Sequence, residues 1–351
     1  MNVQRIAAAD ALARLDGFDA VIDARSESEF ALDHLPDAVN WPSLRDAERV
    51  TVGTLYQQSS PFEARKLGAA LVARNIAAHI EREVLDKPRN WQPLLYCWRG
   101  GQRSGALALV LAQIGFRVHV IESGYKAFRA ALLDDLPRRV APLRWQVICG
   151  PTGSGKTRLL RALAQAGAQT LDLEALASHR ASVLGVIPGQ PQPAQKRFDT
   201  LLWQALKAFD PARPVFVEAE SKKVGNLTVP ESLMAAMRAS PCVRIDLPED
   251  ERVALLLEDY PYFVQDPDFF CRRLAALAAL RGHAVVESWI ASARAGQTEA
   301  VVRDLLIRHY DPGYEKSTRR NFAQFDQART LTLQNRSEEE LARAAGWLLQ
   351  T

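Results

Sequence analysis

Residues 94–104 read Leu-Leu-Tyr-Cys-Trp-Arg-Gly-Gly-Gln-Arg-Ser, and this stretch decides how the first part of the chain folds. The apolar residues Leu94 to Tyr96 predict a short buried strand, and the apolar run after Gly105 predicts a helix. Cys97 therefore stands between the end of a strand and the start of a helix. At such a place the helix dipole and the N–H groups of the loop favour a thiolate. The position predicts a nucleophile.

The loop that follows Cys97 is suited to hold an anion. Gly100 and Gly101 allow the positive φ angles that turn several N–H groups inward. Arg99 and Arg103 add positive charge nearby. We therefore predict that Cys97 is catalytic and that the following residues cradle a chalcogen or another anion: Trp98, Arg99, Gly100, Gly101, Gln102 and Arg103.

Strands and helices alternate on both sides of this loop. Residues 20–23 and 117–121 have the composition of short strands, and residues 62–85 carry apolar side chains at helical spacing. Strands that alternate with helices are typical of a parallel sheet covered on both faces. The first part of the chain is therefore predicted to be an α/β domain.

A second strand–loop–helix pattern begins at residue 145. The apolar residues 145–149 run into Gly-Pro-Thr-Gly-Ser-Gly-Lys-Thr, which has the spacing of a phosphate-binding loop, and an apolar helix follows. Lys156 is expected to bridge phosphate oxygens, and the Thr157 hydroxyl is expected to hold Mg²⁺. The predicted diphosphate-binding residues are Gly150, Pro151, Thr152, Gly153, Ser154, Gly155, Lys156 and Thr157.

Charged residues follow a later strand of the same half. The strand predicted at 215–217 ends at Glu218, and Glu218 and Glu220 are candidates to hold Mg²⁺ or to orient a reactant. Further strands are predicted at 170–173 and 243–247, whereas the chain beyond Asp250 reads as helical. Residues 180–193 form a long excursion that suits either a lid or an ordinary connecting loop.

Local basic clusters are candidates for contact with RNA. Lys222 and Lys223 form one cluster, and Arg319 and Arg320 form the other. The second lies within residues 310–322, where aromatic and basic residues alternate. That pattern suits stacking on bases and contact with phosphates, and it equally suits a solvated loop between two helices.

Composition limits the class of protein. A chain of 351 residues has the length of two domains, and 48% hydrophobic with 24% charged residues is ordinary for a globular protein. The net charge of +3 does not by itself indicate nucleic-acid binding. Four scattered cysteines suggest neither disulfides nor a zinc site, and no apolar run suggests a membrane span or a signal peptide. We expect a reduced, cytoplasmic protein.

The first part of the chain resembles the rhodanese family over about residues 5–135. The resemblance rests on the segments 23–30 and 34–38, the cysteine loop, and Gly-Tyr-Lys-Ala-Phe at 124–128. It implies that Cys97 carries sulfur or selenium as a persulfide or perselenide. Asp23 and Arg25 are then expected to tie the loops together rather than to react.

The spacing in the cysteine loop departs from that resemblance. Cys97 to Arg103 spells Cys-x5-Arg, one residue longer than in many rhodaneses that have an arginine there, and it matches the spacing of cysteine phosphatases. A larger loop suits a larger anion. Phosphatase action on a protein is therefore an alternative.

The combination of motifs, in this order, resembles the bacterial tRNA 2-selenouridine synthase family over essentially the whole chain. The resemblance implies a tRNA substrate with 2-thiouridine at the wobble position, and selenophosphate and geranyl diphosphate as co-substrates. We expect no tightly bound cofactor, with Mg²⁺ as a candidate ion at the phosphate loop. The resemblance also implies replacement of sulfur by selenium through an S-geranylated intermediate. Two alternatives are an ATP-dependent tRNA thiolation enzyme and a nucleotide-regulated switch with a rhodanese-like sensor.

The expected fold class is α/β. It comprises an N-terminal rhodanese-like parallel-sheet domain at 1–136, a linker at 137–143, and a P-loop domain at 144–351 with a helical C-terminal part. The prolines of the linker are expected to discourage a continuous helix there.

Overall fold

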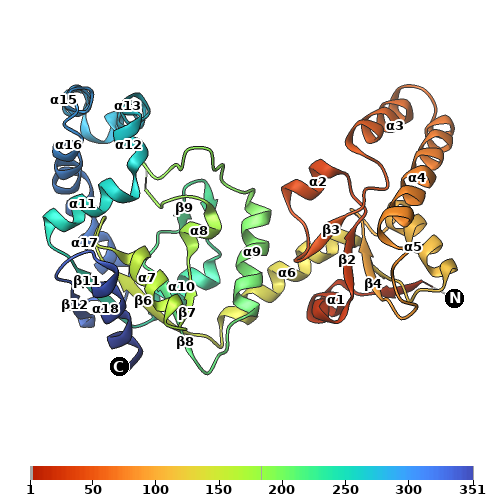
Figure 1. The fold of residues 1–351 in the computed structure, drawn as a ribbon, viewed down its shortest axis with the longest axis horizontal. Coiled ribbons are helices and arrows are strands. Elements are labelled where there is room, and N and C mark those ends of the chain that lie inside the picture. The colour runs from red at the N-terminus through yellow and green to blue at the C-terminus, as the bar shows by residue number, and fades with distance from the viewer. Residues whose placement is uncertain (1–2, 183, 351) are drawn as a thin grey trace. The chain divides into compact units, whose positions relative to one another are not determined.

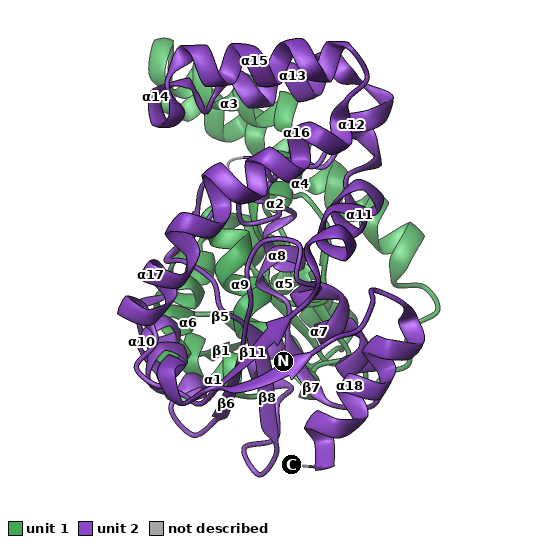
Figure 2. Cartoon of the chain, turned by 90° about the vertical axis from the view of Figure 1, so that its left-hand side faces the viewer, with its two compact units in different colours: residues 1–138, 194–204 green, residues 139–193, 205–351 purple. Residues whose placement is uncertain are grey.

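The computed structural model describes residues 3–182 and 184–350 of the chain. These residues form two compact units, which Figure 2 shows in different colours. The first unit comprises residues 1–138 and 194–204, and the second comprises residues 139–193 and 205–351. Each unit is built on its own parallel sheet.

The first unit has a five-stranded parallel sheet with the strand order β1-β5-β4-β2-β3. The strands are β1 (Gln4–Ile6), β2 (Ala20–Asp23), β3 (Ala38–Asn40), β4 (Pro93–Tyr96) and β5 (His119–Ile121). In the register of the sheet, Ile22 of β2 lies opposite Leu95 of β4. The strand predicted at 94–96 is therefore the central one, and the parallel sheet predicted from the alternating pattern is confirmed.

Helices connect the strands of the first sheet (Figure 1). They are α1 (Ala8–Ala13), α2 (Glu27–Leu32), α3 (Asp46–Gln58), α4 (Pro61–Glu83), α5 (Gln102–Ile114) and α6 (Gly124–Val140), with a 3₁₀ turn at Leu15–Gly17. The core joins Leu107 and Leu111 of α5 to Leu95 and Val120 of the sheet and to Ile76 of α4. Apolar side chains spaced three or four residues apart thus bury one face of α4 and of α5.

The division between the two units at 138/139 falls within the linker expected at 137–143, but the structure differs from the expectation in two other respects. Helix α6 continues through Pro137 to Val140, so most of the linker expected at 137–143 is helical. In addition, the first ten residues of α9 (Gln195–Lys207) belong to the first unit. Contacts between residues far apart in the sequence hold them there, and sequence periodicity does not report such contacts.

The second unit also has a five-stranded parallel sheet, with the order β12-β11-β6-β8-β7. The strands are β6 (Arg144–Cys149), β7 (Gln169–Leu171), β8 (Pro214–Glu218), β11 (Cys242–Asp246) and β12 (Arg329–Thr332); β9 (Lys223–Val224) and β10 (Leu227–Thr228) form a small antiparallel pair. The strand before the phosphate loop is again central, with Val147 opposite Val217.

Two groups of helices accompany this sheet. Those around the strands are α7 (Lys156–Gln165), α8 (Leu173–Ala177), α10 (Glu231–Ala239) and α18 (Glu338–Gln350). A separate helical region comprises α11 (Glu249–Asp259), α12 (Pro261–Gln265), α13 (Pro267–Ala275), α14 (Ala278–Arg281), α15 (His283–Arg294), α16 (Thr298–Leu305), a π-helical turn (Leu306–Tyr310) and α17 (Asp311–Asn321), followed by a 3₁₀ turn at Phe325–Gln327. That region has its own apolar core around Phe270, Leu274 and Trp289.

One interpretation of the end of the chain is excluded, and one expectation was wrong. Residues 311–321 form helix α17, which excludes the solvated loop that was one of two interpretations of this segment. The chain beyond Asp250 is also not wholly helical, because β12 adds an edge strand beside β11 and buries Leu331 and Leu333 against α7 and α18. A four-residue strand has too few residues for its alternation to stand out. Among the described helices, none is long and apolar enough to cross a membrane.

Candidate functional site

Cys97 directly follows the central strand of the first sheet and precedes α5. Its side chain is only 3% exposed. The Ser104 hydroxyl donates a hydrogen bond to Cys97 Sγ over 3.2 Å, and Ser104 lies in the first turn of α5. The positive end of that helix therefore faces the sulfur, as the sequence predicted.

Residues 124–126 hold the cysteine loop through its backbone. The N–H of Tyr125 donates to the carbonyl of Cys97 (2.8 Å), and the N–H of Lys126 donates to that of Trp98 (3.1 Å). Gly124 lies so close that a Cβ there would collide with the carbonyl oxygen of Cys97. The Trp98 ring stacks on Tyr125 with 5.4 Å between centroids. These contacts explain why a glycine–tyrosine turn accompanies this loop.

Two details of the predicted anion cradle differ in the structure. Gly100 has a positive φ of 63°, but Gly101 has a φ of −97° and begins α5. Arg103 forms an ion pair with Glu29 over 2.6 Å, so part of its charge is already balanced. Burial raises the pKa of Glu29, but Arg103, the Ser26 N–H and the charge of Arg49 together outweigh burial, so the pKa is lowered. Arg99 is exposed.

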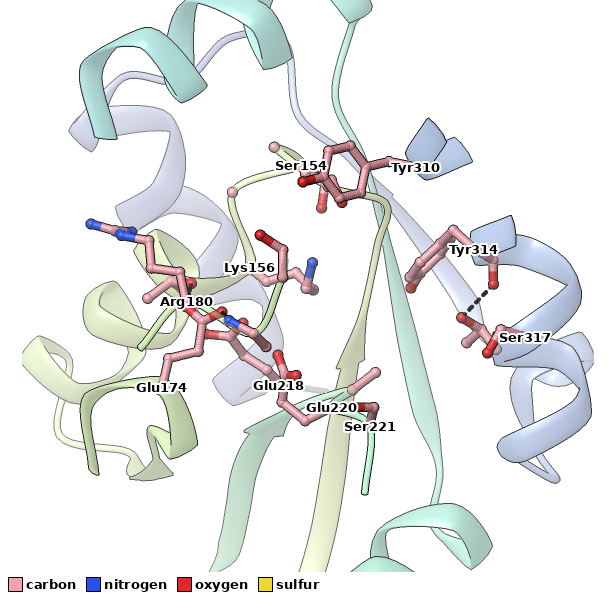
Figure 3. A pocket seen from close by; sticks show the side chains of 18 of the residues that line it. Ser154, Lys156, Glu174, Arg180, Glu218, Glu220, Ser221, Tyr310, Tyr314 and Ser317 are labelled. Carbon is pink, nitrogen blue, oxygen red and sulfur yellow. Dashed lines mark hydrogen bonds between the residues drawn. The ribbon is translucent and has the colours of Figure 1, made fainter. Parts of the chain in front are cut away.

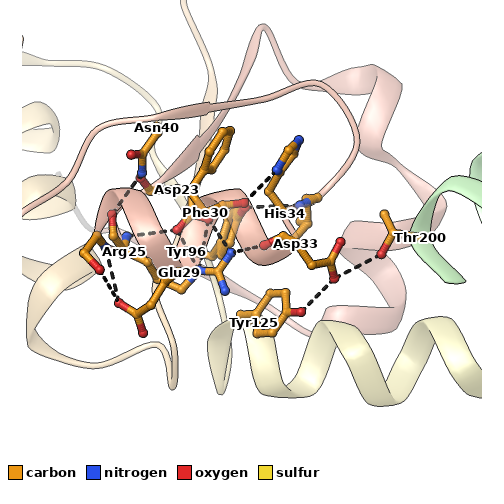
Figure 4. A network of polar contacts seen from close by, with 12 residues as sticks. Asp23, Arg25, Glu29, Phe30, Asp33, His34, Asn40, Tyr96, Tyr125 and Thr200 are labelled. Atoms are coloured by element: carbon orange, nitrogen blue, oxygen red, sulfur yellow. Dashed lines mark hydrogen bonds and ion pairs between the residues drawn. The ribbon is translucent and has the colours of Figure 1, made fainter. Parts of the chain in front are cut away.

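Asp23 and Arg25 tie the surrounding loops together, as expected (Figure 4). The Arg25 guanidinium is 1% exposed; it pairs with Asp23 (2.6 Å), donates to the carbonyl of Asp33 (2.6 Å), and lies 3.9 Å from the centroid of the Tyr125 ring. The Asp33 carboxylate accepts bonds from Tyr125 (2.7 Å) and from Thr200 of α9 (3.2 Å). The network connects the cysteine loop to the part of α9 that belongs to this unit.

The phosphate loop in the second unit lies between β6 and α7. Lys156 Nζ donates to the carbonyl oxygens of Gly150 (2.8 Å) and Pro151 (3.4 Å), so its ammonium group lies inside the loop. Arg252 of α11 donates to the Thr152 carbonyl (2.8 Å) and pairs with Asp311 (2.6 Å). The loop is thus fixed to the helical region that follows the sheet.

Three carboxyl groups crowd the floor of the cleft beside this loop (Figure 3). Carboxylate oxygens of Glu174, Glu218 and Glu220 lie within 4.8 Å of one another. Burial, followed by the neighbouring Glu174, raises the pKa of Glu218 to about 8, and burial raises the pKa of Glu220 well above its usual range. One oxygen of Glu218 is buried without a hydrogen-bond partner. The crowding of these three carboxyl groups favours either their protonation or the binding of a cation between them.

The cleft that holds these groups has a volume of about 330 Å³. Lys156 lies in the middle of it, with Arg180 to one side and Tyr314 to the other, and the Tyr310 ring lies near the loop (Figure 3). The N–H of Gly150 donates to the Tyr314 hydroxyl. Tyr310 and Tyr314, two of the aromatic residues of 310–322, therefore line the cleft.

The predicted RNA-binding residues are exposed and partly paired. Lys222 forms an ion pair with Glu231 (3.0 Å), and Arg319 pairs with Glu315 (3.2 Å) and Asp326 (2.7 Å). Lys223 and Arg320 are exposed. Lys222 also lines the cleft, as do Ser317 and Asn321 of α17. Acidic neighbours therefore offset part of the positive charge that the sequence showed.

Comparison with known proteins identifies both units. Residues 7–131 match the family model of the rhodanese-like domain, and residues 143–271 match that of the tRNA 2-selenouridine synthase AAA domain. A tRNA 2-selenouridine synthase of Aeromonas salmonicida is 32% identical over 84% of this chain and 86% of its own length. The chain belongs to the tRNA 2-selenouridine synthase family.

Other members of the family match over a smaller share of their length. The tRNA 2-selenouridine synthase of Nitrosomonas europaea is 38% identical over 68% of this chain and 63% of its own length, and that of Marinobacter nauticus is 36% identical over 68% and 65%. The match therefore spans a little under two thirds of these two relatives. The fold class expected from the sequence, a rhodanese-like domain followed by a P-loop domain, is confirmed.

Sequence reasoning missed several residues of the cleft in this family member. Glu174 follows β7, and its carboxylate accepts bonds from the Ala181 N–H (2.7 Å) and the Thr157 hydroxyl (3.5 Å). An acidic residue just after a strand was the available signal, because such residues gather at the carboxyl edge of a parallel sheet. No comparable signal pointed to Arg252, which holds the phosphate loop from α11, and the aromatic pattern that includes Tyr314 pointed to RNA rather than to this cleft.

We expect Gly124→Ala to disturb the cysteine loop and to destabilise the first unit by roughly 2 kcal/mol or more, because the new Cβ collides with the Cys97 carbonyl. Gly115→Ala is the matched control, since Gly115 has a φ of 120° but open space around its Cβ position. Urea unfolding of both variants measures the difference. Equal destabilisation would show that backbone strain alone, and not the contact with the loop, determines the loss.

We expect Glu218→Gln to flatten the pH dependence of stability. Between the ordinary glutamate pKa of 4.5 and the raised value of about 8, folded Glu218 keeps a proton that the unfolded chain has lost. Stability therefore falls as pH rises through this window. The variant lacks that loss, so at about pH 8.5 it should be more stable than the wild type by about 1–3 kcal/mol, with little difference near pH 5.

Unfolding by urea at both pH values measures this effect. Glu287→Gln is the control, because Glu287 is an exposed residue of α15 in the same unit. A Glu218→Gln protein that keeps the wild-type slope between the two pH values contradicts the assignment of the raised pKa to this carboxyl.

Proposed function

We propose that this chain is a tRNA-modifying transferase that replaces the sulfur of wobble 2-thiouridine by selenium, using selenophosphate and geranyl diphosphate. The proposal rests on membership in the tRNA 2-selenouridine synthase family. The observation that carries it is that one chain holds both a rhodanese-type cysteine loop and a phosphate cleft lined by Lys156 and three carboxyl groups. Each loop suits a different reactant.

In this proposal the phosphate cleft binds the diphosphate of the prenyl donor. Lys156 provides a positive charge, and the N–H groups at the start of α7 face the same space. Arg180 and Arg158 line the same cleft. These groups stabilise the negative charge that develops on pyrophosphate as it leaves.

The three carboxyl groups fit a divalent cation that accompanies the diphosphate. Glu174, Glu218 and Glu220 offer oxygen ligands, the type that Mg²⁺ prefers, and the Thr157 hydroxyl lies beside Glu174. Glu218 has a buried oxygen without a partner, which a cation would satisfy. When bound, Mg²⁺ would neutralise charge on the leaving pyrophosphate.

Two transfers account for the overall reaction. In the first, the sulfur of 2-thiouridine forms a bond to C1 of the geranyl group, the C1–O bond breaks, pyrophosphate leaves with the electron pair, and the base loses its N3 proton to solvent. In the second, the selenium of selenophosphate adds at C2, geranylthiol leaves, and water cleaves the Se–P bond to release phosphate. Alkylation is useful because a thiol leaves more readily than bound sulfur.

The cysteine loop is proposed to serve only the second transfer. The loop at the start of α5 would bind the phosphate end of selenophosphate, with Cys97 Sγ beside the selenium. The exposed Arg99 adds charge there, whereas Arg103 is already paired with Glu29. The exposed residues Lys222, Lys223, Arg319 and Arg320 are proposed to contact tRNA phosphates.

We expect Cys97→Ser to abolish selenium incorporation while leaving geranyl transfer within about twofold of wild type, because the Cys97 thiol is proposed to lie beside the selenium donor and has no role in the first transfer. The measurement is mass spectrometry of nucleosides from 2-thiouridine tRNA incubated with the purified chain. Cys271→Ala serves as control, since Cys271 is a core residue of the second unit. Loss of both the geranylated and the selenium-containing nucleoside in a folded Cys97→Ser protein would refute the assignment of Cys97 to the second transfer alone.

We expect Lys156→Ala to reduce geranyl transfer by about 100-fold or more, since the charge on the leaving pyrophosphate loses its main partner. Lys66→Ala removes an exposed lysine paired only with Glu63 on the surface and should be silent. Both rates are read from the same nucleoside assay. A wild-type rate in Lys156→Ala would assign the phosphate loop another role.

Competition between ATP and geranyl diphosphate for the wild-type chain separates this proposal from its alternatives. Stronger binding of geranyl diphosphate supports the transferase. Preference for ATP would instead favour an ATP-dependent tRNA thiolation enzyme or a nucleotide-regulated switch.

A further inference from the structure

A second, apolar pocket opens in the helical region of the second unit. Six of its lining residues are buried apolar side chains, which we call the inner wall: Leu184, Phe263, Phe270, Val302, Leu305 and Leu306. These side chains are between 0% and 7% exposed. They come from the loop after α8, from α12, α13 and α16, and from the π-helical turn. The pocket is therefore a gap within the core of the helical region.

The apolar pocket is continuous with the phosphate cleft. Thr152, Ser182, Tyr260 and Tyr310 line both spaces. Thr152 belongs to the phosphate loop itself, and Arg252 fixes its carbonyl group. A ligand whose anionic head lies at the phosphate loop can therefore extend directly into the apolar pocket.

An aromatic wall leads from the shared neck to the buried end. Tyr260 stacks on Phe263 with 5.2 Å between centroids, and Phe263 stacks on Phe270 with 4.5 Å. Phe270 is fully buried. Stacked rings present flat, apolar, poorly deformable surfaces, which suit an unsaturated hydrocarbon chain.

The chemistry of the inner wall excludes a polar occupant. None of its six side chains carries a hydrogen-bonding group. The nitrogen atoms of a nucleobase would lose their hydrogen bonds to water there, and burying them without partners is unfavourable. A hydrocarbon group loses nothing comparable and gains about fourfold in affinity for each methylene removed from water.

We propose that this pocket binds the far end of the prenyl tail while the phosphate loop binds the diphosphate, and that Phe263 and Phe270 limit the length of the tail. This inference rests on the proposed use of geranyl diphosphate. The open volume of the pocket is about 40 Å³, which is room for roughly three groups of the size of water. It therefore accepts the terminal isopropylidene group of the tail, which has three carbon atoms, and a longer insertion requires the aromatic wall to move.

The first test fills the pocket. We expect Val302→Phe to weaken binding of geranyl diphosphate to the purified full chain with Mg²⁺ by at least about tenfold, because the new ring occupies the space of several methylenes. Its affinity for inorganic diphosphate should match that of the wild type. Val285→Phe is the matched control, since Val285 packs on the same helical core but does not line the pocket.

The two ligands separate failure of this inference from failure of the proposed function. If the wild type binds geranyl diphosphate more tightly than both inorganic diphosphate and ATP, and Val302→Phe removes that advantage, the tail site is supported. If the advantage persists in Val302→Phe, the tail lies elsewhere although the donor is right. If the wild type shows no advantage for geranyl diphosphate, both the donor and the tail site are wrong.

The second test enlarges the pocket. We expect Phe263→Ala to improve binding of farnesyl diphosphate, which is one isoprenyl unit longer, by about tenfold or more relative to geranyl diphosphate. Thermal unfolding confirms that the variant is folded, and Val302→Phe provides the independent arm should it not be. An unchanged preference between the two donors in folded Phe263→Ala would overturn the assigned limit on tail length.

Discussion

Both functional loops of this chain connect the carboxyl end of a central parallel strand to the amino end of the helix that follows. β4 is the middle strand of the first sheet, and β6 is the middle strand of the second. At this place the first N–H groups of the helix have no partner within the helix, and the neighbouring strands end at the same edge. A thiol or a phosphate placed there meets positive potential, and residues from adjacent strands can reach it.

Because neighbouring strands end at the same edge of the sheet, carboxyl groups crowd together in the second unit. Glu174 and Glu218 follow adjacent strands, and Glu220 lies two residues further on, so their carboxyl groups converge beside Lys156. Burial raises the pKa of all three carboxyl groups, and repulsion from Glu174 raises the pKa values of Glu218 and Glu220 further. Full ionisation of the three groups is therefore unfavourable without further positive charge beside them.

Segments distant in the sequence complete each site. The turn at Gly124–Tyr125 holds the cysteine loop, and Thr200 of α9 joins the network around Asp33. In the second unit, Arg252 and Tyr314 hold the phosphate loop from α11 and α17. Helix α11 fixes the phosphate loop through Arg252 and also lines the apolar pocket through Leu256 and Leu257, so one helix contributes to both spaces.

The sequence alone determined the central strands of the two sheets and the two loops that follow them. The reason is that these features depend on local patterns: an apolar strand, a glycine-containing turn at fixed spacing and an amphipathic helix are each formed by consecutive residues. The positions of Cys97, Lys156 and the strand-end Glu218 were all predicted in this way.

Only the tertiary structure decided which side chains meet. It paired Arg103 with Glu29, brought Glu174 to Glu218, turned Tyr310 and Tyr314 toward the cleft, and placed the start of α9 in the first unit. Each of these contacts joins residues from different elements. The residue pattern within one element does not determine the angle at which that element packs against another. Helix α6 runs through Pro137 for a related reason: packing of buried residues such as Leu136 and Val140 outweighs the local cost of a proline.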